Sequence, residues 1–375
     1  MVSSTLSRLC GQLLSVGFEG PEAPDELLRR IAASEVGGVM LFRPNITSPA
    51  QVAALVTRLR EASPTAAPAL LVSVDQEGGL VQRLRAPLTE WPDMLSVGGA
   101  GDATLTERVG RAVGDELAAL GIGWDFAPVL DVHTNPANPV IGNRAFGTTP
   151  ETVATQALAF WRGLRAAGLV GCGKHFPGHG DTRTDSHHEL PVVDHDIARL
   201  RRIELAPFAA AAAAGMEAFM TAHVVYPALD PDRPATLSRA ILTDLLRGQL
   251  GFRGVIVSDD LGMKAVADRY PIEELAVASV RAGADHLLVR EPASRQRAAH
   301  EALIRAAEAD ADLRARVEES AARVAALKAV VRVGMPVPAA ALPGLLGRPE
   351  HRALAASFKR QSANGAVARS PVADS

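Results

Sequence analysis

One segment of the chain passes directly from an apolar run into a dense set of titratable side chains. It reads Leu169-Val170-Gly171-Cys172-Gly173-Lys174-His175-Phe176-Pro177-Gly178-His179-Gly180-Asp181-Thr182-Arg183-Thr184-Asp185-Ser186-His187-His188. The apolar part has the pattern of a buried strand, and the polar part begins where that strand should end. Parallel sheets and barrels present their chemistry at the carboxyl ends of their strands. The segment therefore predicts a strand of an α/β fold followed by a functional loop.

The same alternation recurs along the chain. Short apolar runs predict strands at 13–18, 38–42, 69–75, 123–128, 170–175, 218–223, 254–259 and 286–289. Between them, segments rich in Ala, Leu, Arg and Glu predict helices at 49–61, 103–120, 152–167, 197–214, 238–250 and 272–282. Glycines that are typical of helix ends follow four of these helices: Gly121, Gly168, Gly215 and Gly283. Eight strands alternating with helices favour a single-domain α/β fold of the (β/α)8 TIM-barrel type over an open doubly wound sheet.

The composition narrows the class of protein. The chain has 375 residues, of which 47% are hydrophobic and 22% charged, as in ordinary globular proteins. A net charge of −3 and an aromatic content of 4% argue against nucleic-acid binding. No apolar stretch has the length of a membrane span, and the first residues lack the pattern of a signal peptide, so we expect a cytoplasmic protein without membrane contact. Two cysteines, Cys10 and Cys172, do not form a disulfide framework.

The amino-acid composition changes near Gly334. We assign residues 1–334 to the barrel and 335–361 to an extension in which 348–361 form a last helix. Residues 362–375 are small and polar, which predicts a disordered tail. We expect a monomer that needs no cofactor.

The loop after Lys174 contains a pair suited to proton transfer. Asp185 and His187 are two residues apart, so an extended backbone places them on one side. An aspartate can orient the imidazole, which then acts as general acid and base. The other histidines of the loop are more typical of hydrogen-bonded scaffold. A metal site is a weaker interpretation, because the helical His-Glu-x-x-His form is absent and Pro177 prevents a helix there.

Two further strand ends carry candidate residues. The run 254–258 leads into Asp259, a carboxylate that can attack an anomeric carbon, and into Asp260, which we expect to cap the next helix. After the third strand, Asp75 can accept hydrogen bonds from sugar hydroxyls, and Arg83 can donate them. Arg144 is another potential donor.

In combination, three motifs resemble glycoside hydrolase family 3, and within it the β-N-acetylglucosaminidases. They are Lys174-His175-Phe176-Pro177-Gly178-His179-Gly180, Asp185-Ser186-His187 and Ser258-Asp259-Asp260-Leu261-Gly262-Met263, within a similarity that extends from Gly11 to about Gly334. The resemblance implies retaining cleavage of terminal β-linked N-acetylglucosamine. Asp259 matches the nucleophile, His187 the acid/base and Asp185 its partner. The positions that match sugar-binding residues of the family are Asp75, Arg83, Arg144, Lys174 and His175.

The resemblance also implies a substrate. In single-domain bacterial members it is a small carbohydrate or muropeptide of cell-wall recycling, N-acetylglucosaminyl-1,6-anhydro-N-acetylmuramic acid with or without its peptide. Two departures concern secondary positions. Leu80 stands where the motif often has Arg, and Arg43-Pro44-Asn45 replaces a more usual Arg-Asn ending, so we assign no role to Arg43.

Several alternatives remain open at the level of sequence. A neutral histidine base repels phosphate less than a carboxylate would, so a phosphorylase is one alternative and a broader β-glycosidase another. Substrate-assisted catalysis, with Asp259 and Asp260 orienting the N-acetyl group, is a third. A catalytically silent sugar-binding protein is the fourth, and the combination of Asp185, His187 and Asp259 argues against it.

Overall fold

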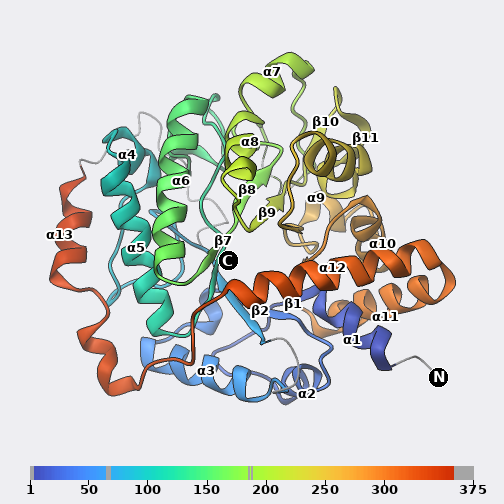
Figure 1. Ribbon diagram of the computed structural model, residues 1–375, viewed down its shortest axis with the longest axis horizontal. Helices are drawn as coiled ribbons and strands as arrows, with labels where there is room; N and C mark the ends of the chain where they lie inside the picture. The colour runs from blue at the N-terminus through green and yellow to red at the C-terminus, as the bar shows by residue number, and fades with distance from the viewer. Residues whose placement is uncertain (1–3, 65–68, 185, 187–188, 359–375) are drawn as a thin grey trace.

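The computed structural model describes residues 4–64, 69–184, 186 and 189–358 of the chain. Short parallel strands lie at its centre, and helices surround them (Figure 1). The central strands are β1 (Leu14–Val16), β2 (Gly38–Leu41), β3 (Leu71–Val74), β6 (Trp124–Asp125), β7 (Val170–Gly171), β8 (Gly173–Phe176), β9 (Ala218–Thr221), β12 (Val255–Val257) and β13 (Leu287–Val289). All eight predicted strands are present, with β7 and β8 together forming the fifth.

The central strands pair in two parallel ladders. One has the order β13-β1-β2-β3-β6-β7, and the other has the order β12-β9-β8. The ladders are linked through Cys172, which separates β7 from β8, and by a single bridge between Val257 and His286. This succession of eight strands is that of a TIM-type barrel, although the ladders do not join into one closed sheet. The predicted fold class is therefore confirmed in a barrel-like form.

In the described part of the chain, the helices include those predicted, in the same order, and six that were not predicted. They are α1 (Ser4–Gln12), α2 (Asp25–Ala32), α3 (Pro49–Glu61), α4 (Met94–Gly99), α5 (Ala103–Ala119), α6 (Pro150–Ala166), α7 (Ile197–Arg202), α8 (Ala206–Ala213), α9 (Lys264–Ala267), α10 (Ile272–Ala282), α11 (Ala293–Ala309), α12 (Ala311–Val330) and α13 (Pro349–Ser357). The four glycines predicted at helix ends all have positive φ, from 75° to 130°. Left-handed backbone of this kind ends a helix at little cost when the residue is glycine.

Local structure also differs from the prediction in four places. The segment 197–214 forms two helices, because Pro207 lacks an N–H and lies in the first turn of α8 rather than inside a longer helix. The segment 238–250 forms a π-helix at Ala240–Gln249. Two antiparallel hairpins were not predicted: β4 (Gln76–Gly78) with β5 (Val81–Gln82), and β10 (Val225–Tyr226) with β11 (Asp230–Pro234).

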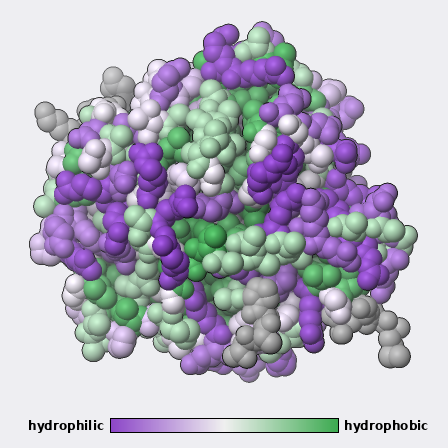
Figure 2. All heavy atoms as spheres, viewed as in Figure 1, coloured by the Kyte–Doolittle hydropathy of each residue, from purple (hydrophilic) through white to green (hydrophobic). Residues whose placement is uncertain are grey.

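The segment after the barrel returns to its outer surface. Helix α13 packs near α5, where Glu116 accepts hydrogen bonds from the backbone N–H of Gly347 (2.9 Å) and lies 3.1 Å from Nδ1 of His351. This helix lies in the stretch 348–361, where a last helix was predicted. The division into domains stays a prediction. The tail predicted at 362–375 lies outside the described residues. On the face shown in Figure 2, hydrophilic and hydrophobic residues are interspersed. Within the described ranges, no helix has the length and apolar character needed to cross a membrane.

Two basic side chains are buried near the amino-terminal ends of the strands. Lys328 of α12 donates a hydrogen bond to Oε1 of Gln12, just before β1, at 2.6 Å. Burial lowers its pKa to about 7. His286, just before β13, packs against the ring of Trp124 at a centroid distance of 5.5 Å. Burial lowers its pKa to about 3.

Candidate active site

A pocket at the carboxyl ends of the strands contains six of the predicted site residues. They are Asp75, Arg83, Arg144, Lys174, His175 and Asp259. The remaining two, Asp185 and His187, lie outside the described residues, but Ser186 between them lines the same pocket. The structure thus brings together residues from four parts of the chain, and their chemical roles stay predictions.

One wall of the pocket is a network of buried ion pairs. Nζ of Lys174, on β8, lies 2.6 Å from Asp75 and 2.5 Å from Glu77. Arg144 donates two hydrogen bonds of 2.8 Å to the carboxylate of Glu77. Arg83 lies 3.6 Å from the second oxygen of Asp75. Paired geometry of this kind orients donors and acceptors before a ligand arrives.

The network keeps its members charged. Burial by itself raises the pKa of the Glu77 carboxyl, but the charges of Arg144 and Lys174 outweigh burial and hold this pKa below its ordinary value. Burial likewise lowers the pKa of Lys174, and Asp75 and Glu77 together raise it above the ordinary value. At neutral pH the wall therefore offers ionised groups, which suit hydrogen bonding to sugar hydroxyls.

A buried aspartate that the sequence did not reveal as functional orients His175. Oδ2 of Asp131 lies 2.7 Å from Nδ1 of His175, and Oδ1 accepts the backbone N–H groups of His175 (3.1 Å) and His179 (2.6 Å). Burial raises the pKa of Asp131, but the charge and hydrogen bond of His175 together with those of His179 outweigh burial, so that the net shift of this pKa is downward. The apolar pair Val129-Leu130 before Asp131 was the signal that this position also follows a strand, since Val129 bridges to Lys174.

His179 behaves as scaffold. Its Nδ1 lies 2.8 Å from the hydroxyl of Thr182, and its Nε2 lies 3.1 Å from the hydroxyl of Ser186. Burial lowers its pKa to about 4, so the ring is neutral at physiological pH. These contacts tie the start of the loop to Ser186 at the pocket.

The end of β12 contributes the two adjacent aspartates. Asp259 lines the pocket, and its Oδ1 accepts the backbone N–H of Asp260 at 2.8 Å. Asp260 accepts the backbone N–H groups of Gly262 (2.9 Å) and Arg290 (3.1 Å). The expectation that Asp260 caps the next helix is wrong, because α9 begins without a side-chain cap. Burial raises the pKa of Asp260 above its ordinary value.

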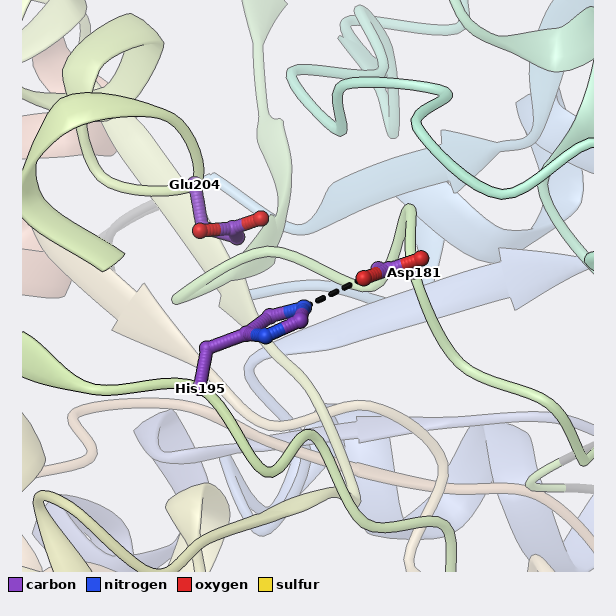
Figure 3. A group of neighbouring side chains, drawn as sticks. All are labelled: Asp181, His195 and Glu204. Atoms are coloured by element: carbon purple, nitrogen blue, oxygen red, sulfur yellow. Dashed lines mark hydrogen bonds and ion pairs between the residues drawn. The ribbon is translucent and has the colours of Figure 1, made fainter. Parts of the chain in front are cut away.

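A second polar cluster connects the two ends of the loop that follows β8. Figure 3 shows Asp181, His195 and Glu204 approaching one another from separate segments, with a contact between Asp181 and Nε2 of His195. The three side chains are of types that bind metals. However, the guanidinium of Arg199 lies 3.2 Å from Glu204 and 3.7 Å from Asp181. Arg199 already supplies the positive charge that these carboxylates need, so we assign no metal to the cluster.

Comparison with known proteins gives consistent results. Residues 5–327 match the glycosyl hydrolase family 3 N-terminal domain. The beta-hexosaminidase of Chromobacterium violaceum is 44% identical over 69% of this chain and 73% of its own length. That of Neisseria meningitidis serogroup C is 43% identical over 71% of this chain and 74% of its own.

Solved structures show the same relationship. A glycoside hydrolase family 3 β-N-acetylglucosaminidase from Paenibacillus has a TM-score of 0.89 and 44% identity, covering 93% of this chain and 67% of that one. Native NagZ from Neisseria gonorrhoeae has a TM-score of 0.74 and 32% identity, covering 93% of this chain and 96% of that one.

Proposed function

The chain belongs to glycosyl hydrolase family 3 and is a glycoside hydrolase, and from this premise we propose that it is a retaining exo-β-N-acetylglucosaminidase. Similar proteins described as beta-hexosaminidases or β-N-acetylglucosaminidases support this activity. One observation carries the proposal. The pocket that contains the carboxylate of Asp259 also contains the network of Asp75, Lys174 and Arg144.

The pocket is chemically suited to a neutral amino sugar. Its charged groups offer hydrogen bonds to hydroxyl and amide groups. Apolar side chains complete the lining and suit the methyl group of an acetamide: Met40, Val81, Val140, Met220, Met263 and Leu288. A mixture of apolar surface with a few oriented polar groups is typical of small-ligand sites.

The first chemical step breaks the glycosidic bond. A carboxylate oxygen of Asp259 attacks the anomeric carbon, and the bond to the aglycone oxygen breaks. The imidazolium of His187, oriented by Asp185, gives its proton to that leaving oxygen. The products of this step are the free aglycone and a glycosyl ester on Asp259.

In the second step, His187 accepts a proton and Asp259 becomes the leaving group. Neutral His187 takes a proton from water, the water oxygen attacks the anomeric carbon, and Asp259 leaves as a carboxylate, with net retention. Ser186 supports a role of its two neighbours in the pocket. It is buried, its hydroxyl contacts His179, and its carbonyl accepts the backbone N–H of Ala265 at 3.3 Å.

We further propose that the aglycone is 1,6-anhydro-N-acetylmuramic acid, with or without its peptide, and that the enzyme acts in cytoplasmic cell-wall recycling. The chain covers 96% of native NagZ from Neisseria gonorrhoeae, which supports a comparison with compact members of the family.

Two measurements on the full chain test this function. A 5-fluoro-N-acetylglucosaminyl fluoride should leave a glycosyl adduct on the peptide that contains Asp259, as detected by mass spectrometry. Proton NMR of the muropeptide disaccharide reaction should show β-N-acetylglucosamine as the first product, with or without phosphate. An adduct on another residue, or N-acetylglucosamine 1-phosphate as the main product, would contradict the proposal.

A further inference from the structure

Arg290 occupies the reactive side of the pocket, and the mechanism above gives it no role. It directly follows β13, lines the pocket together with Asp259 and Asp260, and has a side chain that is 23% exposed. Its backbone N–H donates to Asp260, so the chain itself fixes Arg290 beside the two aspartates. The question is what its guanidinium binds.

Three consecutive strand ends hold this guanidinium in place. The strands β13, β1 and β2 are neighbours, and they are followed by Arg290, Gly17 and Phe42, respectively. The centre of the guanidinium lies 4.4 Å from the centroid of the Phe42 ring, in cation–π contact. A Cβ atom on Gly17 would lie 2.9 Å from the Phe42 ring and 3.2 Å from Cγ of Arg290. The missing side chain at Gly17 therefore allows Phe42 and Arg290 to meet across β1.

The hydrogen-bonding capacity of Arg290 is only partly used. Its Nε forms an ion pair with Glu291 at 2.7 Å but has no hydrogen-bond partner. Within the described ranges, no protein group accepts a hydrogen bond from its two terminal nitrogens either. Arg144 in the same pocket differs, because its guanidinium donates to both oxygens of Glu77 and to the carbonyl of Val140. Arg290 thus presents a flat, oriented pair of donors to the pocket, with a positive charge.

The ligand that suits such a group is an oxyanion. A guanidinium edge binds a carboxylate with two parallel hydrogen bonds, which are stronger than bonds to neutral hydroxyls. N-Acetylglucosamine is uncharged, so the anion has to belong to the other half of the substrate. We infer that Arg290 binds a carboxylate on the aglycone and makes the enzyme selective for acidic aglycones. This inference rests on the proposed function.

A matched pair of substrates isolates the charge. The 4-carboxyphenyl and 4-carbamoylphenyl β-N-acetylglucosaminides have nearly the same shape, and only the first has a carboxylate. The quantity measured is the ratio of their kcat/KM values, acid over amide. The wild type should favour the acid, and Arg290→Gln should lower the ratio about tenfold or more, the loss typical of a charge-assisted hydrogen bond. Arg290→Lys, which keeps the charge without the planar fork, should give an intermediate ratio.

A matched control is available on a neighbouring segment. Arg85 is an exposed arginine that pairs loosely with Glu90 and does not line this pocket. Arg85→Gln should keep the wild-type ratio. Gly17→Ala, which displaces Phe42 and Arg290 without removing a charge, should lower it.

The outcomes separate this inference from the proposed function. If the wild type hydrolyses both glycosides and Arg290→Gln leaves the ratio unchanged, the role of Arg290 is wrong and the proposed function stands. An equal acid-to-amide ratio in Arg290→Gln and Arg85→Gln would also show that the proposed role of Arg290 is wrong. If the wild type hydrolyses neither glycoside, the proposed function itself fails.

Discussion

At the pocket end of the barrel-like core, three buried charged side chains pair with one another, whereas at the opposite end burial shifts Lys328 and His286 toward their neutral forms. Glu77, Arg144 and Lys174 meet at 2.5–2.8 Å, and their partners move each pKa toward the charged form. Burial lowers the pKa of Lys328 to about 7 and that of His286 to about 3, toward the neutral forms.

The comparison shows under which conditions a buried side chain keeps its charge. Removing a charge from water is unfavourable, so an isolated buried group neutralises, and a group stays ionised only with partners of opposite charge. Such pairs add little net stability compared with apolar packing. The opposite end also contains a buried paired charge, because Asp285, just before His286, meets Arg247, Arg316 and Arg323. Pairing therefore depends on local partners, and at the pocket end the paired charges also line the cavity, where they serve binding and catalysis. Substitutions at the pocket end should therefore reduce activity, and those at the other end should change only stability.

The largest effect is expected for Asp259→Asn. The amide cannot form the glycosyl ester, so turnover of 4-nitrophenyl N-acetylglucosaminide should fall on the order of 10⁴-fold or more. The midpoint of thermal unfolding should stay close to that of the wild type, because only the nucleophile changes. Substantial residual turnover would remove Asp259 from this role.

His187→Ala should have the next largest effect. Loss of a positioned proton donor typically costs about 10²- to 10⁴-fold in rate. The loss should be smaller for activated aryl glycosides, whose leaving groups need no proton, than for the muropeptide disaccharide. The two substrates are compared by kcat/KM, and equal losses on both would argue against an acid role.

Glu77→Gln tests the buried ion pairs of the pocket through the stability of the protein. The variant leaves Arg144 and Lys174 short of a buried counter-charge, which should cost about 3–5 kcal/mol in the free energy of unfolding. Glu107→Gln is the matched control, since Glu107 pairs with Arg162 at 3.0 Å with both side chains exposed, and should cost at most about 1 kcal/mol. Urea denaturation measures both, and equal costs would contradict the contrast between the two environments.

Lys328→Met tests the opposite end of the core and should have the smallest effect on activity. The pKa of Lys328 is about 7 in the folded protein, against an ordinary value of 10.5. Between these pH values the unfolded chain holds a proton that the folded chain has lost, so the stability of the wild type rises with pH. Below pH 7 both states are protonated, and the penalty of burying the charge is complete.

The variant removes this penalty. Its stability advantage over the wild type should be greatest below pH 7, and it should shrink by at most about 1.4 kcal/mol per pH unit toward pH 10.5. Urea unfolding at pH 8 and 9 is sufficient to detect the trend, with activity unchanged. Lys264→Met, at an exposed position, is the control and should show no such trend. An advantage that is constant with pH would contradict a depressed pKa at Lys328.

Much of the architecture could be predicted because its signals are local. Runs such as 254–258 have strand length and composition, and glycines such as Gly168 and Gly283 end helices in the left-handed conformation. The same signals predicted that residues after successive strands share one pocket. The division of 197–214 was also predictable, since Pro207 cannot continue a helix. The π-helix at 240–249 has no comparable local signal.

The unpredicted parts of the site depend on partners far away in sequence. Glu77 could be read as part of the stretch after the third strand, but its pairing with Arg144 spans 67 residues. Asp131 acts on His175 across 44 residues. Arg290 is set by contacts with Phe42 and Asp260, which belong to other strand ends. Such contacts form only when distant strands come together in the fold, so neighbouring residues in the sequence do not predict them.

The contact between Asp181 and His195 predicts that stability and activity respond differently to a change in the length of the loop between them. Because these residues meet at the base of the loop, the segment between them departs from and returns to the same point of the scaffold. Lengthening a segment whose ends are already joined costs only about 0.6 kcal/mol for each doubling of its length. Insertions between these residues should therefore leave the fold stable, whereas they should lower activity, because Asp185 and His187 lie in the same segment.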